Sequence, residues 1–92
     1  MITIKFFTLL RLLVKIREIK INADEIPIVE LLYKCENSVP TKFIYKLLDK
    51  DNSLIPGTII LINGINIHHL KKEKTIVKDS DLVELFPPGG GG

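Results

Sequence analysis

Apolar and polar residues alternate at the start of the chain, where Ile2, Ile4 and Phe6 stand at every second position. Alternation with period two is typical of a strand with one buried face, so residues 1–7 are predicted to form the first strand. Phe7 falls on the polar face of this strand. Its ring is either an exposed aromatic group at a binding surface or a ring that folds over the edge of the sheet.

The next two segments are less regular. Residues 8–14 are rich in leucine and fit either a helical turn or a buried loop, because no glycine or proline marks a turn there. Residues 15–21 alternate imperfectly, with isoleucines at three positions. We predict a second strand, antiparallel to the first and joined to it as a hairpin.

Two segments then change to the spacing of an amphipathic helix. A polar loop at 22–25 precedes the main helix, predicted at 27–36, because Pro27 suits a first helical turn. Residues 40–49 are predicted as a second, shorter helix. The apolar residues of the main helix are Ile28, Leu31, Leu32 and Cys35. Cys35 is interpreted as a small buried hydrophobic residue rather than a nucleophile.

The second half of the chain is predicted to return to strands. A continuous run of apolar residues at 58–62 suggests a central strand buried on both faces. Asn63 and Gly64 favour a type I′ hairpin turn, after which the chain returns. The further extended segments are residues 65–67, 75–77 and 82–86. This order of elements predicts an α+β, ubiquitin-like β-grasp fold with a mixed sheet of four or five strands and one main helix.

The last six residues differ from everything before them. Pro87 and Pro88 cannot continue a ladder of hydrogen bonds, so we expect a domain over residues 1–86 and an extended tail over residues 87–92. Glycine lacks a Cβ, so the tail can enter a narrow channel. The residues that would line it are Gly89, Gly90 and Gly91, and the reactive group is expected to be the carboxylate of Gly92. The alternative is a flexible linker or a cloning remnant.

Composition narrows the class of protein. The chain has 92 residues, 46% of them hydrophobic, and a net charge of +2, which predicts one small globular domain. Its scattered lysines do not predict nucleic-acid binding, although residues 71–74 form either a solvated loop or a lysine patch for an acidic partner. One cysteine fits a cytoplasmic protein without an internal disulfide. No signal peptide or membrane span is expected.

No self-contained active site is predicted. His68 and His69 are adjacent, so on a strand they would face opposite ways and would not share a metal ion. The acidic residues at Asp49 and Asp51 lack the further ligands of a calcium loop. We therefore expect no bound metal or cofactor and a non-catalytic role, in which chemistry occurs at the chain terminus. A carboxylate reacts only after activation, for example as an acyl-adenylate.

Four stretches together resemble a known family. They are residues 4–7 with Arg11, residues 61–67, residues 79–88, and the Gly-Gly end. The chain resembles the MoaD family, which comprises the small sulfur-carrying subunit of molybdopterin synthase and its archaeal relatives. The Phe-Pro-Pro segment before Gly-Gly is the most specific part of this resemblance.

The resemblance implies a reaction cycle and partners. An adenylating enzyme of the ubiquitin-activating type would use ATP and magnesium to adenylate Gly92, and a sulfur donor would then form a thiocarboxylate. The tail would insert into the large subunit of molybdopterin synthase, with no direct role for nucleic acid or membrane. The residues placed where such carriers bind partners are Phe7, Arg11, Ile65, Phe86 and Pro87. Ordinary core or edge packing is the alternative for the first four of them.

Three other functions share these features. A thiazole sulfur carrier of the ThiS kind has the same fold and end, although such chains are usually shorter and lack Phe-Pro-Pro. A carrier for tRNA thiolation, or a protein modifier of the archaeal ubiquitin-like kind, would use the same terminus. A plain interaction module with an inert tail would not depend on Gly92. The chain departs from the MoaD pattern at Gly89, Gly90 and Ser80, which bears on partner identity more than on the carrier role.

Overall fold

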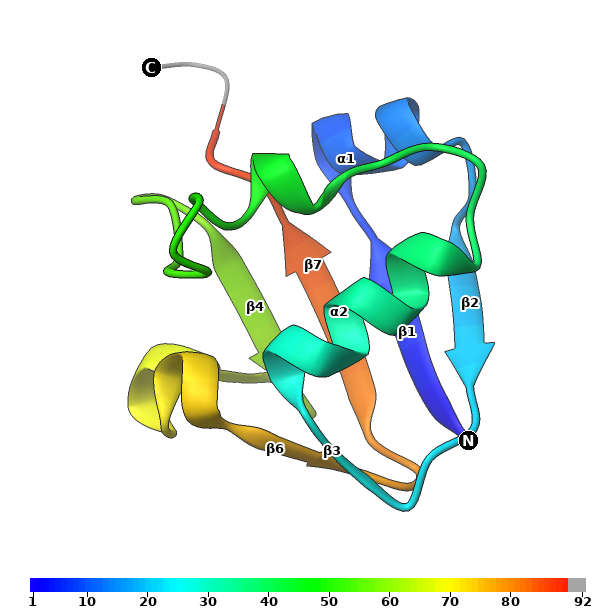
Figure 1. Cartoon of the computed structure of the whole chain (residues 1–92), viewed down its shortest axis with the longest axis vertical. Coiled ribbons are helices and arrows are strands. Elements are labelled where there is room, and N and C mark those ends of the chain that lie inside the picture. The colour runs from blue at the N-terminus through cyan, green and yellow to red at the C-terminus, as the bar shows by residue number, and fades with distance from the viewer. Residues whose placement is uncertain (90–92) are drawn as a thin grey trace.

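The computed structural model describes residues 1–89, and Figure 1 shows how the elements are arranged. A mixed five-stranded sheet has the order β2-β1-β7-β4-β5, with β1 and β7 parallel and all other neighbours antiparallel. The strands are β1 (Ile2–Phe6), β2 (Glu18–Ile21), β4 (Ile59–Ile62), β5 (Ile65–Asn66) and β7 (Leu82–Phe86). With α2 crossing the sheet, this confirms the predicted α+β β-grasp architecture.

The main helix, α2 (Ile28–Asn37), supplies one wall of the core. Its four apolar positions, Ile28, Leu31, Leu32 and Cys35, are fully buried. Burying each of the larger side chains contributes about 1.5–3 kcal/mol of transfer free energy. The predicted helix is confirmed, shifted by one residue, because Pro27 still belongs to a strand.

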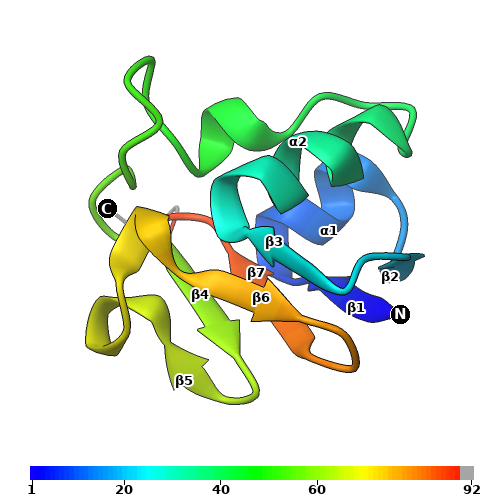
Figure 2. The same cartoon turned by 60° about the horizontal axis from the view of Figure 1, so that its bottom comes forward.

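That strand is part of a second, two-stranded sheet that the sequence did not indicate. β3 (Glu25–Pro27) pairs antiparallel with β6 (Ile76–Lys78), and Figure 2 shows the two strands side by side. The extended segment predicted at 75–77 is thus confirmed with a shift of one residue. The end of the predicted polar loop instead forms β3, because Ile26 is buried opposite Val77.

The leucine-rich segment forms a helix, α1 (Thr8–Val14). It ends at Lys15, which takes a left-handed φ of 64° while its N–H donates to the Arg11 carbonyl at 2.8 Å. This backbone conformation is usually left to glycine, so its absence from the sequence hid the helix end. The predicted strand at 15–21 is wrong in its first half, since only Glu18–Ile21 pairs with β1.

The second predicted helix at 40–49 is wrong. Only a 3₁₀ turn forms, at Ile44–Lys46. The Glu36 carboxylate accepts the N–H groups of Phe43 and Ile44 at 2.9 and 3.0 Å, and the Thr58 hydroxyl donates to the Leu47 carbonyl. These long-range hydrogen bonds satisfy backbone groups that a helix would otherwise pair.

β4 is not buried on both faces as predicted. Ile60 and Ile62 point into the core, whereas Ile59 is 42% exposed. The predicted turn after it is confirmed, because Asn63 and Gly64 both have positive φ, 52° and 83°, as a type I′ turn requires.

The chain beyond β5 forms 3₁₀ turns at Ile67–His69 and Lys72–Lys74. His68 and His69 are exposed, as expected, but they lie in a turn rather than on a strand. Within residues 1–89, no helix is both long and apolar enough to cross a membrane.

Candidate functional site: the root of the tail and its surroundings

The tail leaves the molecule from the end of β7, which lies at the centre of the sheet beside β1. Pro87 is buried and Pro88 is half-buried, so the backbone stays packed for two residues beyond the last strand. Gly89 is exposed and has open space where a side chain would stand. The predicted reactive residue Gly92 lies outside the described residues, as do Gly90 and Gly91.

Gly57 supports the tail root, a role that sequence reasoning missed. Its φ is +93°, and a Cβ added to it would lie 3.3 Å from the Cβ of Pro88. The backbone of the turn before β4 therefore approaches the tail as only glycine allows. The Pro-Gly dipeptide signalled the turn, but only the fold shows that the tail packs on it.

Phe7 and Phe86 stack on each other at the same end of the sheet. Their ring centroids are 4.6 Å apart and their planes differ by 12°. The parallel register that pairs Phe6 with Leu85 brings the following two residues together, and the Phe7 N–H donates to the Leu85 carbonyl at 3.1 Å. Both rings are half-buried, so the pair forms part of the surface and also fixes the direction in which the tail leaves.

The stack continues into an apolar surface across β4. Ile59 is paired in register with Phe86, and Leu61 with Glu84. Ile59 is 42% exposed and Leu61 is half-buried. We call Phe7, Ile59, Leu61 and Phe86 the outer-face patch. Apolar groups that are left exposed together mark a surface suited to a protein partner.

Arg11 projects from α1 beside this patch. Arg11 and Phe7 line the same groove of about 220 Å³, with Arg17 and Glu18 at its side. Arg11 is exposed, and no ion pair involves it among residues 1–89. A guanidinium held free beside two aromatic rings can bind a partner carboxylate with two hydrogen bonds.

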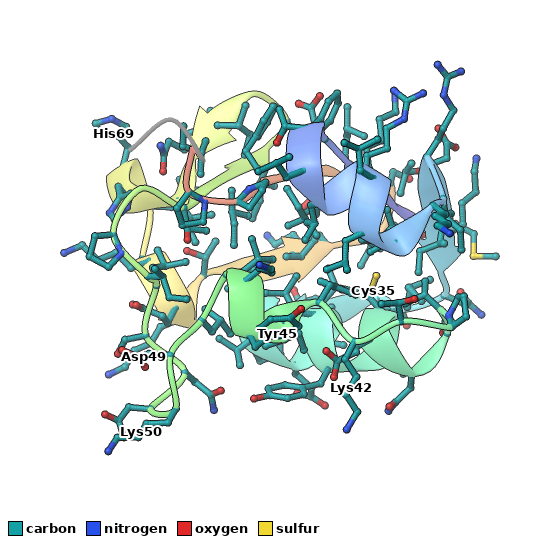
Figure 3. All side chains as sticks on the ribbon, turned by 90° about the horizontal axis from the view of Figure 1, so that it is seen from above. Cys35, Lys42, Tyr45, Asp49, Lys50 and His69 are labelled. Carbon is teal, nitrogen blue, oxygen red and sulfur yellow. The ribbon has the colours of Figure 1, made fainter. Side chains whose placement is uncertain are left out.

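A second groove, of about 320 Å³, runs along the other side of α1 next to the tail root. It is lined by Leu9, Leu10, Tyr45, Lys46, Ile55, Pro87 and Pro88. Leu9 and Tyr45 are 55% and 60% exposed, and Figure 3 labels Tyr45 on its turn. Neither residue was predicted for the site, because their segments gave no clear element from sequence.

The structure therefore brings together Phe7, Arg11, Phe86 and Pro87, all at the end of the sheet from which the tail leaves. Ile65 is not among them. It lies on β5, paired with Ile62 at the other end of β4, and is 50% exposed. Three residues of strand separate Ile62 from Ile59, which is about 10 Å. A partner-binding role for Ile65 stays a prediction, and it would concern a different part of the surface.

Cys35 is placed where it does not act as a nucleophile. Its side chain is fully buried, and Figure 3 shows its sulfur turned toward the interior from α2. Burial, with a smaller contribution from the Glu36 carboxylate, raises the pKa of the thiol to about 12. The reactive thiolate is therefore scarce at neutral pH, in agreement with the structural role predicted for this residue.

The histidines and acidic residues do not gather into a metal site in the described part of the chain. Among residues 1–89, no group of three or more His, Cys, Asp or Glu side chains is arranged to hold a metal ion. Figure 3 shows His69 at the edge of the molecule.

Comparison with known proteins agrees with this description. The model of the ThiS family matches residues 4–92. The chain belongs to the ThiS family. It is also 27% identical over 75 residues to an Archaeoglobus fulgidus protein described as "Putative sulfur carrier protein", which covers 82% of this chain and 84% of the relative.

Solved structures extend the likeness to the whole domain. The chain is similar to the small archaeal modifier protein 1 (SAMP1) from Methanosarcina acetivorans, with a TM-score of 0.78, 29% identity and coverage of 99% of this chain and 95% of that one. It is also similar to Urm1 from Sulfolobus solfataricus, with a TM-score of 0.69, 25% identity and coverage of 92% and 97%.

These relatives refine the family resemblance drawn from the sequence. The ubiquitin-like superfamily and the β-grasp fold are confirmed. The relatives are named as a sulfur carrier, SAMP1 and Urm1 rather than as MoaD. The resemblance to the ThiS-type carriers and archaeal modifiers is therefore better supported than a specific assignment to molybdopterin synthase.

Proposed function

We propose that this ThiS-family chain is a ubiquitin-like sulfur carrier whose reactive group is the carboxylate of Gly92. The single observation that carries the proposal is the tail root. β7 ends in two packed prolines beside an aromatic stack and an uncompensated arginine, so the fold aims a glycine tail away from a surface suited to a partner. The family match extends to residue 92, and the named relatives are a sulfur carrier and two ubiquitin-like proteins.

The chemistry follows from the properties of a carboxylate. Being anionic, it resists nucleophiles until an oxygen of Gly92 attacks the α-phosphorus of ATP, releasing pyrophosphate and forming an acyl-adenylate. A sulfur nucleophile then displaces AMP and leaves a thiocarboxylate. A lysine amine that displaces AMP or the sulfur would instead form an isopeptide bond. ATP and magnesium belong to the adenylating enzyme in this scheme.

Docking on that enzyme is proposed to use the outer-face patch together with Arg11 and Pro87. The extended tail from Gly89 to Gly92 spans at most about 13–14 Å, so the tail root must come close to the enzyme's surface. An apolar patch with one cation at its edge provides contact area and orientation.

Two kinds of acceptor are compatible with this terminus. The named relatives, SAMP1 and Urm1, favour the carrier or modifier of the archaeal ubiquitin-like kind over a carrier dedicated to molybdopterin. We therefore propose tRNA thiolation or lysine modification as the first roles to test, and the large subunit of molybdopterin synthase as the next partner.

The test is the intact mass of the protein after incubation with ATP, magnesium, an adenylating enzyme and a sulfide source. Conversion of the terminal hydroxyl to a thiol adds about 16 Da. A chain that lacks Gly92 is the control and should gain nothing. A gain on both proteins would place the sulfur elsewhere, and no gain with several adenylating enzymes from the same organism would favour the inert-tail module.

A further inference from the structure

A second exposed apolar groove lies away from the tail and is not used by the proposed function. It has a volume of about 540 Å³ and is lined by Glu25, Leu70, Lys71, Thr75, Ile76 and Lys78. We call it the lysine groove. Figure 1 shows β6 and the preceding turns at the bottom of the molecule, while the tail root leaves from the top.

Two aliphatic side chains form the apolar part of this groove. Leu70 is 43% exposed and Ile76 is 44% exposed. Ile76 is paired in register with Pro27 on β3, so its backbone is fixed while its side chain remains accessible. Two branched aliphatic groups in one groove offer contact area that burial in the core does not use.

The groove is held in shape by hydrogen bonds rather than formed by loose loops. The Lys71 N–H donates to the buried Thr75 hydroxyl at 3.0 Å, and the Thr75 carbonyl accepts the Ile28 N–H at 2.8 Å. The Leu54 N–H donates to the Glu73 carboxylate at 2.9 Å. These contacts tie the turns to α2 and to the loop before β4, so a ligand would not have to order them.

The charge around the groove is positive. Lys71 and Lys78 line it, and Lys72 and Lys74 are exposed on the adjoining turn. Two glutamates stand against these four lysines: Glu25, opposite Lys78 in register, and Glu73, whose carboxylate is bonded to a backbone N–H. Among residues 1–89, no lysine forms an ion pair.

We infer that the lysine groove binds an acidic, aliphatic peptide segment of a partner protein, independently of the tail chemistry. Aliphatic side chains of the segment would lie on Leu70 and Ile76, and its carboxylates would face Lys71 and Lys78. The same segment could stay bound while the tail is in an enzyme, because the two surfaces lie at opposite ends of the molecule (Figure 1).

Charge and chemistry favour this occupant over two others. A second copy of the chain would place lysines against lysines across a symmetric contact. Single-stranded RNA binds through aromatic platforms, whereas the groove lining has no aromatic ring and carries Glu25, which repels phosphate. An acidic peptide with aliphatic side chains matches both the apolar floor and the lysine rim.

The experiment is an NMR titration of the full-length ¹⁵N-labelled chain. The probe is a synthetic twelve-residue peptide that alternates glutamate with valine. The comparison probes are the same peptide with lysine in place of glutamate, and a twelve-nucleotide single-stranded RNA. We expect saturable shift changes centred on residues 70–78 with the acidic peptide alone.

Matched double variants make the test specific. Lys71→Glu with Lys78→Glu should weaken binding about fivefold or more, because attraction becomes repulsion. Lys20→Glu with Lys42→Glu makes the same change in net charge at exposed positions outside the groove and should weaken binding less than about twofold. All four positions are exposed, and the spectrum itself reports whether each variant is folded.

Several results would overturn the inference. They are no saturable shift up to about 1 mM peptide, the range of very weak association; equal weakening in both double variants; or tighter binding of the RNA. Removal of Gly92 should leave peptide binding unchanged, and Lys71→Glu with Lys78→Glu should leave the 16 Da mass gain unchanged, about as in the unaltered chain. Failure of the groove is thus distinguishable from failure of the carrier function.

Discussion

The two faces of the central sheet are made by the same strands but are used differently. On the inner face, Ile4, Val83 and Leu85 are fully buried under α2 and its neighbours. On the outer face, the residues next to them remain partly exposed, as Ile59 is to 42%. Because strand side chains alternate in direction, one run of sequence builds both the core and a surface for partners.

This difference separates stability from function by residue parity. A substitution on the inner face should reduce the free energy of unfolding and affect sulfur loading only through unfolding. A substitution in the outer-face patch should affect loading more than stability. The four predictions below test this separation, beginning with the largest expected effect.

Ile4→Ala should be the most destabilising of these changes. Ile4 has no exposed surface and lies on β1 between two neighbouring strands, so its truncation leaves a cavity and should cost about 2–5 kcal/mol. Urea denaturation measures the loss. Thr3→Ala, on the outer face of the same strand, is the control and should cost less than about 1 kcal/mol. Similar losses for the two variants would break the comparison of faces.

Gly57→Ala and Gly64→Ala form a matched pair that tests the tail root. Both glycines have positive φ, 93° and 83°, so alanine should cost about 1–2 kcal/mol at each. Only at Gly57 would the new Cβ press on Pro88, at 3.3 Å, whereas open space surrounds Gly64. Urea denaturation should therefore give similar losses, while intact mass should show slower sulfur loading for Gly57→Ala alone. Equal loading rates would remove Gly57 from the site.

The stacked rings can be tested with a double-mutant cycle. Phe7→Ala, Phe86→Ala and the double variant should show a coupling free energy of about 0.5–1.5 kcal/mol in urea denaturation, as measured for aromatic pairs. Each single variant should also slow sulfur loading, since both rings belong to the outer-face patch. If loading follows only the loss of stability, the patch serves the fold and not a partner.

Glu73→Gln should give the smallest effect, and one that depends on pH. The hydrogen bond from the Leu54 N–H lowers the pKa of the Glu73 carboxyl. A carboxyl whose pKa is lower in the folded chain stabilises the fold above its ordinary pKa, and that stabilisation disappears as the pH falls through the lowered value. The two proteins should therefore differ most near pH 7 and converge below about pH 4.

Urea denaturation across this pH range measures the convergence. Glu30→Gln is the control, because Glu30 is exposed on α2 and its carboxylate accepts no hydrogen bond from residues 1–89. A constant difference at all pH values would mean that the Glu73 charge does not stabilise the turn.

Most of the fold was predictable because most of it follows local periodicity. The alternation in β1, the helical spacing of α2 and the Asn63–Gly64 turn each report their structure directly. The errors occur where distant contacts decide. β3 exists because it pairs with β6, and residues 40–49 lose their helix to hydrogen bonds from Glu36 and Thr58.

The site was predictable in part for the same reason. Phe7 and Phe86 stood out from the sequence pattern and the family resemblance, and the register of two parallel strands brings them together. Gly57, Leu9 and Tyr45 were missed because their nearness to the tail root depends on three loops meeting at one end of the sheet. No local signal in the sequence reports such a meeting.

The parallel pairing of β1 with β7 has a consequence for synthesis of the protein. The first strand to leave the ribosome waits for its central neighbour until nearly the whole chain has been made, because Thr3 pairs with Leu82. Contacts between such distant residues form slowly, and until then the apolar faces of β1 and β4 have no partner between them. Folding therefore finishes at the same end of the chain that carries the tail, and an incomplete nascent chain would not present the docking surface to an adenylating enzyme.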